Sequence, residues 1–594
     1  MQQWLRGPSV DREANFQSPC PLGRLPDARP PSPEGDFVPY SKFSRSLVAA
    51  LALTIGGLLP PSASAHARSD QGPVVDAPAG PVAGRSEGGV TSFKGIPYAA
   101  PPIGDLRWKP PQEAARWDGV RDAFDFGPPC YQPSVPGAAN SIYFEEIGSM
   151  SEDCLSLNIW TPESAADAPV LVWIHGGALV SGASSFDMYD GTRLAQQGAV
   201  VVSINYRLGA LGFLAHPELS EESPDSISGN YGLMDQIAAL RWIEENITAF
   251  GGDPDNVTIA GESAGALSVM WLMTAPRAQG LFDKAIMQSA YMISSPALNE
   301  SRNGHPAAEE IGTWLQGELG APDLAAMRDM EPGELVNRAT RAGFLTWSTV
   351  DGVLIPHQIA ETFDRGEQAK VPLIAGFNSG EIRSLRRLLP PPPSGSKTYE
   401  AKIRELYGDL ADVFLALYPA DNIDESMLAA TRDALYGWTA ERLAIKQSAL
   451  GQAAYLYLFD HGYPEADEAG LHAFHASEIP YVFGTIHDTP RNWPRIPRET
   501  AERTLSDAMM QYWVTFARDG TPVASGQVDW PAYGDNSAFL VFDETPQEGA
   551  ELLGTRYDLN EAVVCRRRAA GNQPWHWNIG LASPPLPRRV EGCQ

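Results

Sequence analysis

A short segment around Ser263 has the composition of a nucleophile turn. Residues 261–265 read GESAG and match the pattern G-x-S-x-G. Such a turn joins a strand to a helix so tightly that larger residues at the glycine positions would collide with neighbouring backbone, and it presents the serine at the positive end of the helix. The pattern alone arises often by chance, but here residues 257–260 (VTIA) precede it and a helix-forming segment follows. We therefore predict that Ser263 is a catalytic nucleophile rather than part of a plain turn.

A second segment of small residues predicts where a developing negative charge would bind. Residues 175–178 (HGGA) directly follow the apolar run 169–174 (PVLVWI). Small side chains let backbone N–H groups approach a substrate carbonyl, which is the geometry of an oxyanion hole. We expect the N–H groups of Gly177, Ala178 and Ala264 to form it. The alternative is a flexible glycine turn without a catalytic role.

The elements that must position these residues follow an alternating pattern of strands and helices. Continuous apolar runs predict strands buried on both faces, as in a parallel sheet covered by helices. The predicted strands are residues 169–175, 199–206, 257–261, 284–289, 371–377, 454–459 and 539–542. Residues 230–248 and 264–273 have helical spacing, with Leu233, Ile237, Leu240 and Ile243 on one face of the first helix.

The acidic charge of the chain excludes several classes of partner. The 594 residues include 44 Lys and Arg against 73 Asp and Glu, a formal net charge of −29. This field repels nucleic acid and anionic lipid head groups, so we expect neither as a partner. It favours the approach of neutral or cationic small molecules.

The only long apolar run predicts a secretory signal peptide. Residues 47–59 follow Lys42 and Arg45 and precede a PPSASA segment, with cleavage expected after Ala65 or Ala67. A run of this length is short for a bilayer, so a membrane anchor or a buried helix is the weaker alternative. Signal peptides normally begin near the true N-terminus, which suggests a mis-assigned translation start before about residue 37.

Removal of residues 1–67 leaves residues 68–594 as the expected catalytic domain, in a secreted or periplasmic protein. Four cysteines then remain: Cys130, Cys154, Cys565 and Cys593. An even number of cysteines in an exported protein indicates disulfides, and four cysteines allow three pairings.

From about Gly89 to Tyr533, the chain resembles the type-B carboxylesterase (cholinesterase-like) family. The segments that carry the resemblance are residues 93–99 (FKGIPYA), 151–158 (SEDCLSLN), 205–209 (NYRLG), 229–236 (GNYGLMDQ) and 246–254 (NITAFGGDP). The resemblance implies an α/β-hydrolase fold, with a large, central, mostly parallel sheet flanked by helices in a single large catalytic domain. It also implies a Ser–Glu–His triad that hydrolyses small-molecule carboxylic esters.

Two motifs of this family supply the acid and the base of the triad. Glu381 ends the G-x-N-x-x-E segment that carries the acid, although the residue after it is Ile382 where the family usually has glycine. His475 begins the H-x-x-E-I-P segment that carries the base. His472 is a rival three residues upstream, but it lacks the Glu-Ile-Pro spacing. The chain order serine, acid, base is the one expected for this fold.

The expected mechanism uses neither a metal nor an organic cofactor. His475 would remove the Ser263 proton while Glu381 orients the imidazole, so we expect activity to rise with pH through an ordinary histidine pKa, about 6 to 7. The alternative is that His472 and His475 form an H-x-x-H metal site. Such a site would lack a third ligand at a suitable spacing.

The resemblance also implies structural contacts near the predicted site. It implies a disulfide between Cys130 and Cys154, after which Cys565 and Cys593 form the remaining pair. It further implies an ion pair between Glu152 and Arg207. Ser289 matches a position behind the nucleophile, where we expect it to support the hydrogen-bond network.

The substrate pocket is predicted only in outline. Leu179 follows the oxyanion segment, and Phe344 and Trp347 match positions where the family builds pocket walls. Three arginines closely follow the predicted acid: Arg383, Arg386 and Arg387. They would either contact an acidic substrate group or form a solvated surface.

Two alternatives to a simple esterase follow from the same resemblance. Some relatives of this fold are binding proteins that have lost a triad residue, whereas all three triad positions are intact here. Amidase or lipase activity is the alternative within the enzymes. The oligomeric state is not readable from the sequence.

Overall fold

The computed structural model describes residues 72–134, 137–534, 536–575 and 579–593. The predicted signal peptide and the predicted boundary at residue 67 lie outside these ranges. Within these ranges, no helix is both long enough and apolar enough to cross a membrane.

The larger of two sheets in the described residues has eleven strands. In spatial order the strands are β14 (Pro546–Ala550), β13 (Ala538–Phe542), β12 (Ala454–Phe459), β11 (Leu373–Asn378), β10 (Lys284–Gln288), β9 (Gly252–Glu262), β7 (Ala168–Ile174), β8 (Val200–Ile204), β6 (Ser156–Pro162), β4 (Val90–Pro97) and β3 (Arg85–Glu87). Neighbours from β8 to β13 pair in parallel, and the strands at both edges pair antiparallel. This arrangement confirms the predicted mostly parallel sheet. A separate small sheet contains β1 (Val74–Ala77), β2 (Gly80–Ala83) and β5 (Arg121–Asp122).

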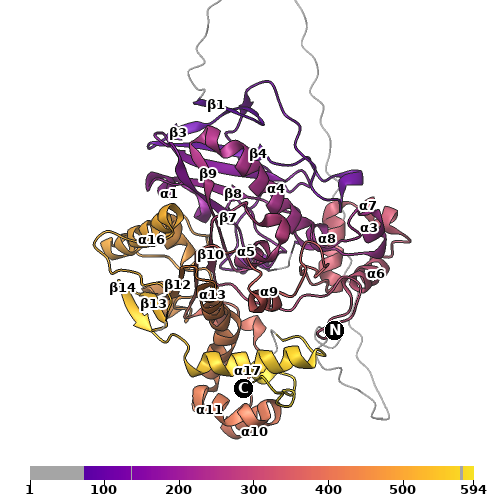
Figure 1. Cartoon of the computed structure of the whole chain (residues 1–594), viewed down its shortest axis with the longest axis vertical. Coiled ribbons are helices and arrows are strands. Elements are labelled where there is room, and N and C mark those ends of the chain that lie inside the picture. The colour runs from indigo at the N-terminus through magenta and orange to yellow at the C-terminus, as the bar shows by residue number, and fades with distance from the viewer. Residues whose placement is uncertain (1–71, 135–136, 535, 576–578, 594) are drawn as a thin grey trace, which may run out of the picture. The chain divides into compact units, whose positions relative to one another are not determined.

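Alternate residues of the central strand β7 pack into two different hydrophobic clusters. Val170, Val172 and Ile174 pack with the predicted apolar face of α4 (Tyr231–Asn246) and with α5 (Ala264–Thr274) and α13 (Trp438–Ala449). Leu171 and Trp173 pack with α16 (Thr500–Asp519). Because successive side chains of a strand point to opposite faces, helices cover both faces of the sheet, as Figure 1 shows.

Further helices connect and extend this framework. They are α1 (Thr192–Gln196), α2 (Gly209–Phe213), α3 (Pro217–Glu222), α6 (Ala308–Glu318), α7 (Leu324–Arg328), α8 (Pro332–Ala342), α9 (Ile359–Arg365), α10 (Ser396–Tyr407), α11 (Ala411–Leu417), α12 (Ile423–Arg432), α14 (Pro464–Glu468), α15 (Ile479–Phe483) and α17 (Thr555–Ala570). Near the C-terminus, α17 lies beside α10 and α11 (Figure 1).

Two disulfides join described residues, Cys130–Cys154 and Cys565–Cys593. The first closes the loop between β5 and β6, and the second joins α17 to the C-terminal segment.

The prediction of an ion pair between Glu152 and Arg207 is wrong. Arg207 instead pairs with Asp235 of α4, with Nη2 and Oδ1 2.7 Å apart and Nε and Oδ2 2.8 Å apart. Glu152 pairs with Arg107, with Nη2 and Oε2 2.6 Å apart. Asp235 is fully buried, and a buried carboxylate needs a charged partner, so it takes the planar donor pair of Arg207. Sequence spacing does not show which carboxylate that partner is.

Candidate active site

The Ser263 turn has the tight strand-to-helix geometry predicted for it, and the backbone of the serine is strained. Ser263 lies between the end of β9 and the start of α5, with φ 55° and ψ −119°. A Cβ atom on Gly265 would lie 2.0 Å from the carbonyl oxygen of Ile174, and one on Gly261 would lie 2.5 Å from the carbonyl carbon of Gly265. Only glycine fits at both positions, so the turn can bring β9, β7 and α5 together. Ser263 is half-buried, at the positive N-terminal end of α5.

The predicted oxyanion segment lies directly against this turn. A Cβ atom on Gly176 would lie 3.3 Å from the Cβ of Ser263. Gly177 and Ala178 have positive φ values of 104° and 57°, and both are exposed, whereas Ala264 is buried. The structure therefore brings the segment that leads into Gly177 and Ala178 next to the serine turn, and Ala264 directly follows Ser263. Binding of an oxyanion by their N–H groups stays a prediction.

Glu381 and His475 form a close, buried pair. Glu381 follows β11, and its Oε1 accepts a hydrogen bond of 2.9 Å from the backbone N–H of Asn378. Its Oε2 lies 2.5 Å from Nδ1 of His475. An isolated β-bridge between Gly380 and Phe474 aligns the segment that carries Glu381 with the segment that carries His475. A carboxylate on Nδ1 holds the proton there and leaves Nε2 to exchange protons with a substrate or a nucleophile.

Glu262, which precedes the serine, faces the other ring nitrogen. Its Oε1 lies 3.1 Å from Nε2 of His475. Within the described part of the chain, Ser263 Oγ has no hydrogen-bond partner. No sequence motif predicts this contact, although the position of Glu262 next to the nucleophile could have indicated it.

Three buried carboxylates surround His475: Glu262, Glu381 and Glu478. Burial by itself lowers the pKa of His475, but these carboxylates outweigh it and raise the pKa to about 9. Burial raises the pKa of Glu262 to about 8 and also raises the pKa of Glu478. The structure thus moves the expected rise of activity with pH upward from the range of an ordinary histidine.

Tyr143 is a further contact of the site, and it was not predicted from the sequence. Its hydroxyl lies 2.9 Å from the carbonyl oxygen of His475 and 2.7 Å from Oγ of Ser384. Tyr143 lies in the loop closed by the Cys130–Cys154 disulfide. No local motif marks it, because its contacts are with residues more than two hundred positions away.

The predicted pocket residues lie in different environments. Leu179 is buried in the main hydrophobic cluster, with 1% of its surface exposed. Phe344 packs against the cluster that contains Leu335, and Trp347 packs against the main cluster. Their contact with substrate stays a prediction.

Two of the three arginines after Glu381 already have carboxylate partners. Arg383 lies 2.8 Å from Glu425, and Arg386 lies 2.6 Å from Asp424. These ion pairs agree with the solvated-surface reading. Ser289 has φ 52°, and its buried Oγ has no hydrogen-bond partner among the described residues, so its expected support of the network is not seen.

Comparison with known proteins identifies the family. The sequence profile of the carboxylesterase family matches residues 71–559. The chain belongs to this family.

Two relatives of the chain are named as esterases of different substrates. It is 36% identical to a fumonisin B1 esterase of Sphingopyxis macrogoltabida, across 78% of this chain and 86% of that protein. It is 35% identical to a para-nitrobenzyl esterase of Bacillus subtilis (strain 168), across 77% and 92%. A solved PNB esterase structure superposes with a TM-score of 0.71 and 33% identity, covering 82% of this chain and 99% of that one. The chain is accordingly an α/β-hydrolase and a serine carboxylic-ester hydrolase.

Proposed function

We propose that ester hydrolysis proceeds through an acyl-enzyme on Ser263, with His475 as the base and Glu381 as the acid that orients it. The contact of 2.5 Å between Glu381 Oε2 and His475 Nδ1 carries this proposal. It lies beside a serine held at a turn that only glycines permit. The strained φ of Ser263 further supports a role that packing alone does not require.

Each group has one role in the proposed mechanism. Nε2 of His475 takes the Ser263 proton as Oγ attacks the ester carbonyl, and the N–H groups of Gly177, Ala178 and Ala264 bind the oxyanion. His475 then protonates the leaving alcohol. Water repeats the sequence and releases the acid. Ser263 Oγ must turn toward Nε2 for the first step, a contact that often forms only with substrate bound.

The substrate is proposed to be a small neutral or cationic ester. The chain carries a net charge of −29, so a negative substrate would meet repulsion on approach. Leu179, Phe344 and Trp347 are the proposed apolar walls. Amidase or lipase activity is the alternative within the same chemistry.

The protein is proposed to act outside the cytoplasm, after removal of residues 1–67. The two disulfides support this, because disulfides persist in oxidising compartments.

The test is hydrolysis of p-nitrophenyl butyrate by residues 66–594, beside Ser263→Ala and the control Ser289→Ala. We expect Ser263→Ala to lower kcat by at least about 10³-fold, because the acyl-enzyme cannot form. Ser289→Ala removes a buried serine hydroxyl close by and should retain most of the activity. Equal rates for wild type and Ser263→Ala, across a wider panel of esters, would support a binding protein instead.

A further inference from the structure

The loop that carries His475 holds a second histidine between two carboxylates. Nδ1 of His472 lies 2.8 Å from Oδ1 of Asp467 on α14. Its Nε2 lies 3.2 Å from Oδ1 of Asp460, which directly follows β12. A histidine donates from both ring nitrogens only when it is protonated, so this arrangement suits the imidazolium. We call these three residues the ion triad.

The backbone at His472 adopts a conformation that needs support. Its φ is 51°, in the left-handed region that non-glycine residues rarely adopt. Gly462 leaves space for the ring, since a Cβ atom there would lie 2.2 Å from His472 Nδ1 and 2.6 Å from Asp467 Oδ1. The ion triad supplies contacts that offset the backbone strain.

The turn that contains His472 packs directly on the segment that ends at Glu381. The N–H of Gly380 donates to the carbonyl of Ala473 over 2.8 Å. The Asn378 amide donates to the carbonyl of Phe474, also over 2.8 Å. Asn378 in turn donates its backbone N–H to the Glu381 carboxylate. A displacement of this turn would therefore reach both members of the Glu381–His475 pair.

We propose that His472 is a positioning residue: the ion triad holds residues 471–474 against residues 378–381 and thereby sets the position of His475 relative to Glu381. This inference rests on the proposed function of His475. His472 was a rival for the base, yet both of its nitrogens are occupied by carboxylates, so it acts through the loop and not on the reacting atoms.

The charge of the ion triad predicts its pH dependence. The charged groups that face His472 are Asp460 and Asp467, and Arg432 of α12 faces Asp460 in turn. The hydrogen bond to Asp460 is the main cause that raises the pKa of His472 to about 9, with Asp467 adding to it against the effect of burial. Since this pKa is above that of an unfolded histidine, the stabilisation is complete below pH about 6.5 and is lost as pH rises through about 9.

The experiment compares kcat, KM and melting temperature for wild type and His472→Gln. At pH about 7.5 we expect kcat to fall about tenfold with KM nearly unchanged, because small misplacements of a base slow catalysis. The ratio of wild-type to variant kcat should shrink toward one by pH about 10.5, when His472 has lost its charge. The control is His357→Gln, a similarly exposed histidine 3.8 Å from Glu367, which should change none of these values.

The second variant is Asp467→Asn, which keeps His472 in the chain. It should lower kcat, as His472→Gln does. Unchanged kcat in both variants overturns the proposal, and so does a lowered kcat whose ratio to wild type is constant across this pH range. The difference in melting temperature between wild type and His472→Gln should also shrink toward alkaline pH. The melting temperature can be measured without any catalytic activity. A stabilising effect of the ion triad can therefore be detected even if Ser263 is not the nucleophile.

Discussion

Glu262 and His475 face each other across 3.1 Å with little access to water, so the charge of one governs the proton of the other. Burial raises the pKa of Glu262, whereas the surrounding carboxylates raise the pKa of His475. A base with a raised pKa is protonated at neutral pH and is freed only at higher pH. At the residue scale, the pH at which the site becomes active therefore depends on Glu262, which occupies a variable position of the G-x-S-x-G motif.

Glu262→Gln should move the acidic limb of the pH profile of kcat/KM to lower pH. Removing a carboxylate that stabilises the imidazolium lowers the pKa of His475, by about one unit or more for a close charge. The measurement is kcat/KM for p-nitrophenyl butyrate from pH about 5 to about 10. The control Glu300→Gln removes the same charge from an exposed ion pair with Arg302 and should leave the limb in place. If the acidic limb of Glu262→Gln stayed at the same pH or moved to higher pH, Glu262 would not stabilise the protonated form of His475 as proposed.

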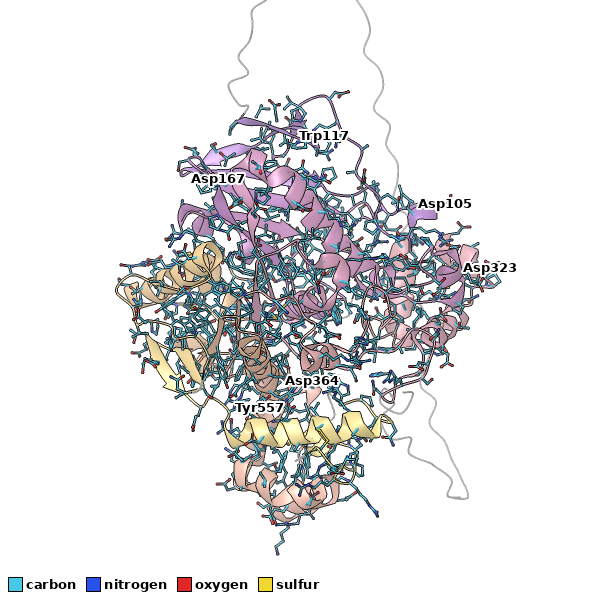
Figure 2. All side chains as sticks on the ribbon, viewed as in Figure 1. Asp105, Trp117, Asp167, Asp323, Asp364 and Tyr557 are labelled. Carbon is cyan, nitrogen blue, oxygen red and sulfur yellow. A yellow bond between two sulfur atoms is a disulfide. The ribbon has the colours of Figure 1, made fainter. Side chains whose placement is uncertain are left out.

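At the scale of elements, a single carboxylate joins three helices. Asp364 of α9, labelled in Figure 2, pairs with Arg442 and Lys446 of α13 and with Arg568 of α17. Arg442 is 1% exposed, so its charge depends on such partners. Burial would raise the pKa of Asp364, but the three cations outweigh it and lower the pKa.

Asp364→Asn should reduce the free energy of unfolding by about 1–2 kcal/mol, between the values for exposed and for buried ion pairs. Because its folded pKa is lowered, the contribution is present above pH about 4 and is lost as pH falls through the folded pKa. Urea unfolding at pH about 7 and at lower pH measures both effects.

The matched control for this change is Asp424→Asn, which breaks a pair with Arg386 in which both side chains are 51% exposed. It should cost less than about 1 kcal/mol. Equal losses for the two variants would mean that Asp364 contributes no more than a surface ion pair.

At the scale of the whole molecule, the two disulfides close loops of similar length, with separations of 24 and 28 residues. The chain-entropy model assigns each about 3 kcal/mol of stability. They differ in what they hold. The Cys130–Cys154 loop carries Tyr143, whose hydroxyl contacts the carbonyl of His475, whereas the second disulfide holds the C-terminal segment.

Replacing both Cys130 and Cys154 by Ser should lower stability by about 3 kcal/mol and also lower kcat, since the Tyr143 loop is released. Replacing both Cys565 and Cys593 by Ser should lower stability by a similar amount and leave kcat within about twofold of wild type. Urea unfolding and p-nitrophenyl butyrate hydrolysis measure the two effects. The same kcat in both double variants would show that the first loop does not support the site.

The sequence by itself determined the features that depend on contiguous residues. The strands and the face of α4 follow from side-chain periodicity, and the Ser263 turn follows from the steric demand for small residues at Gly261 and Gly265. The positions of Glu381 and His475 followed from a resemblance to family motifs, and the structure brings the two side chains together.

Only the tertiary structure decided which charges meet and how far burial shifts them. Arg207 selects Asp235 and not Glu152, Glu262 faces His475, and Tyr143 reaches the same loop from 332 positions away. Such contacts join segments distant in the chain, and the removal of water that shifts a pKa depends on everything packed around the group. Local sequence specifies the backbone conformation of a turn, but the partner of a buried charge is specified by the packing of the whole fold.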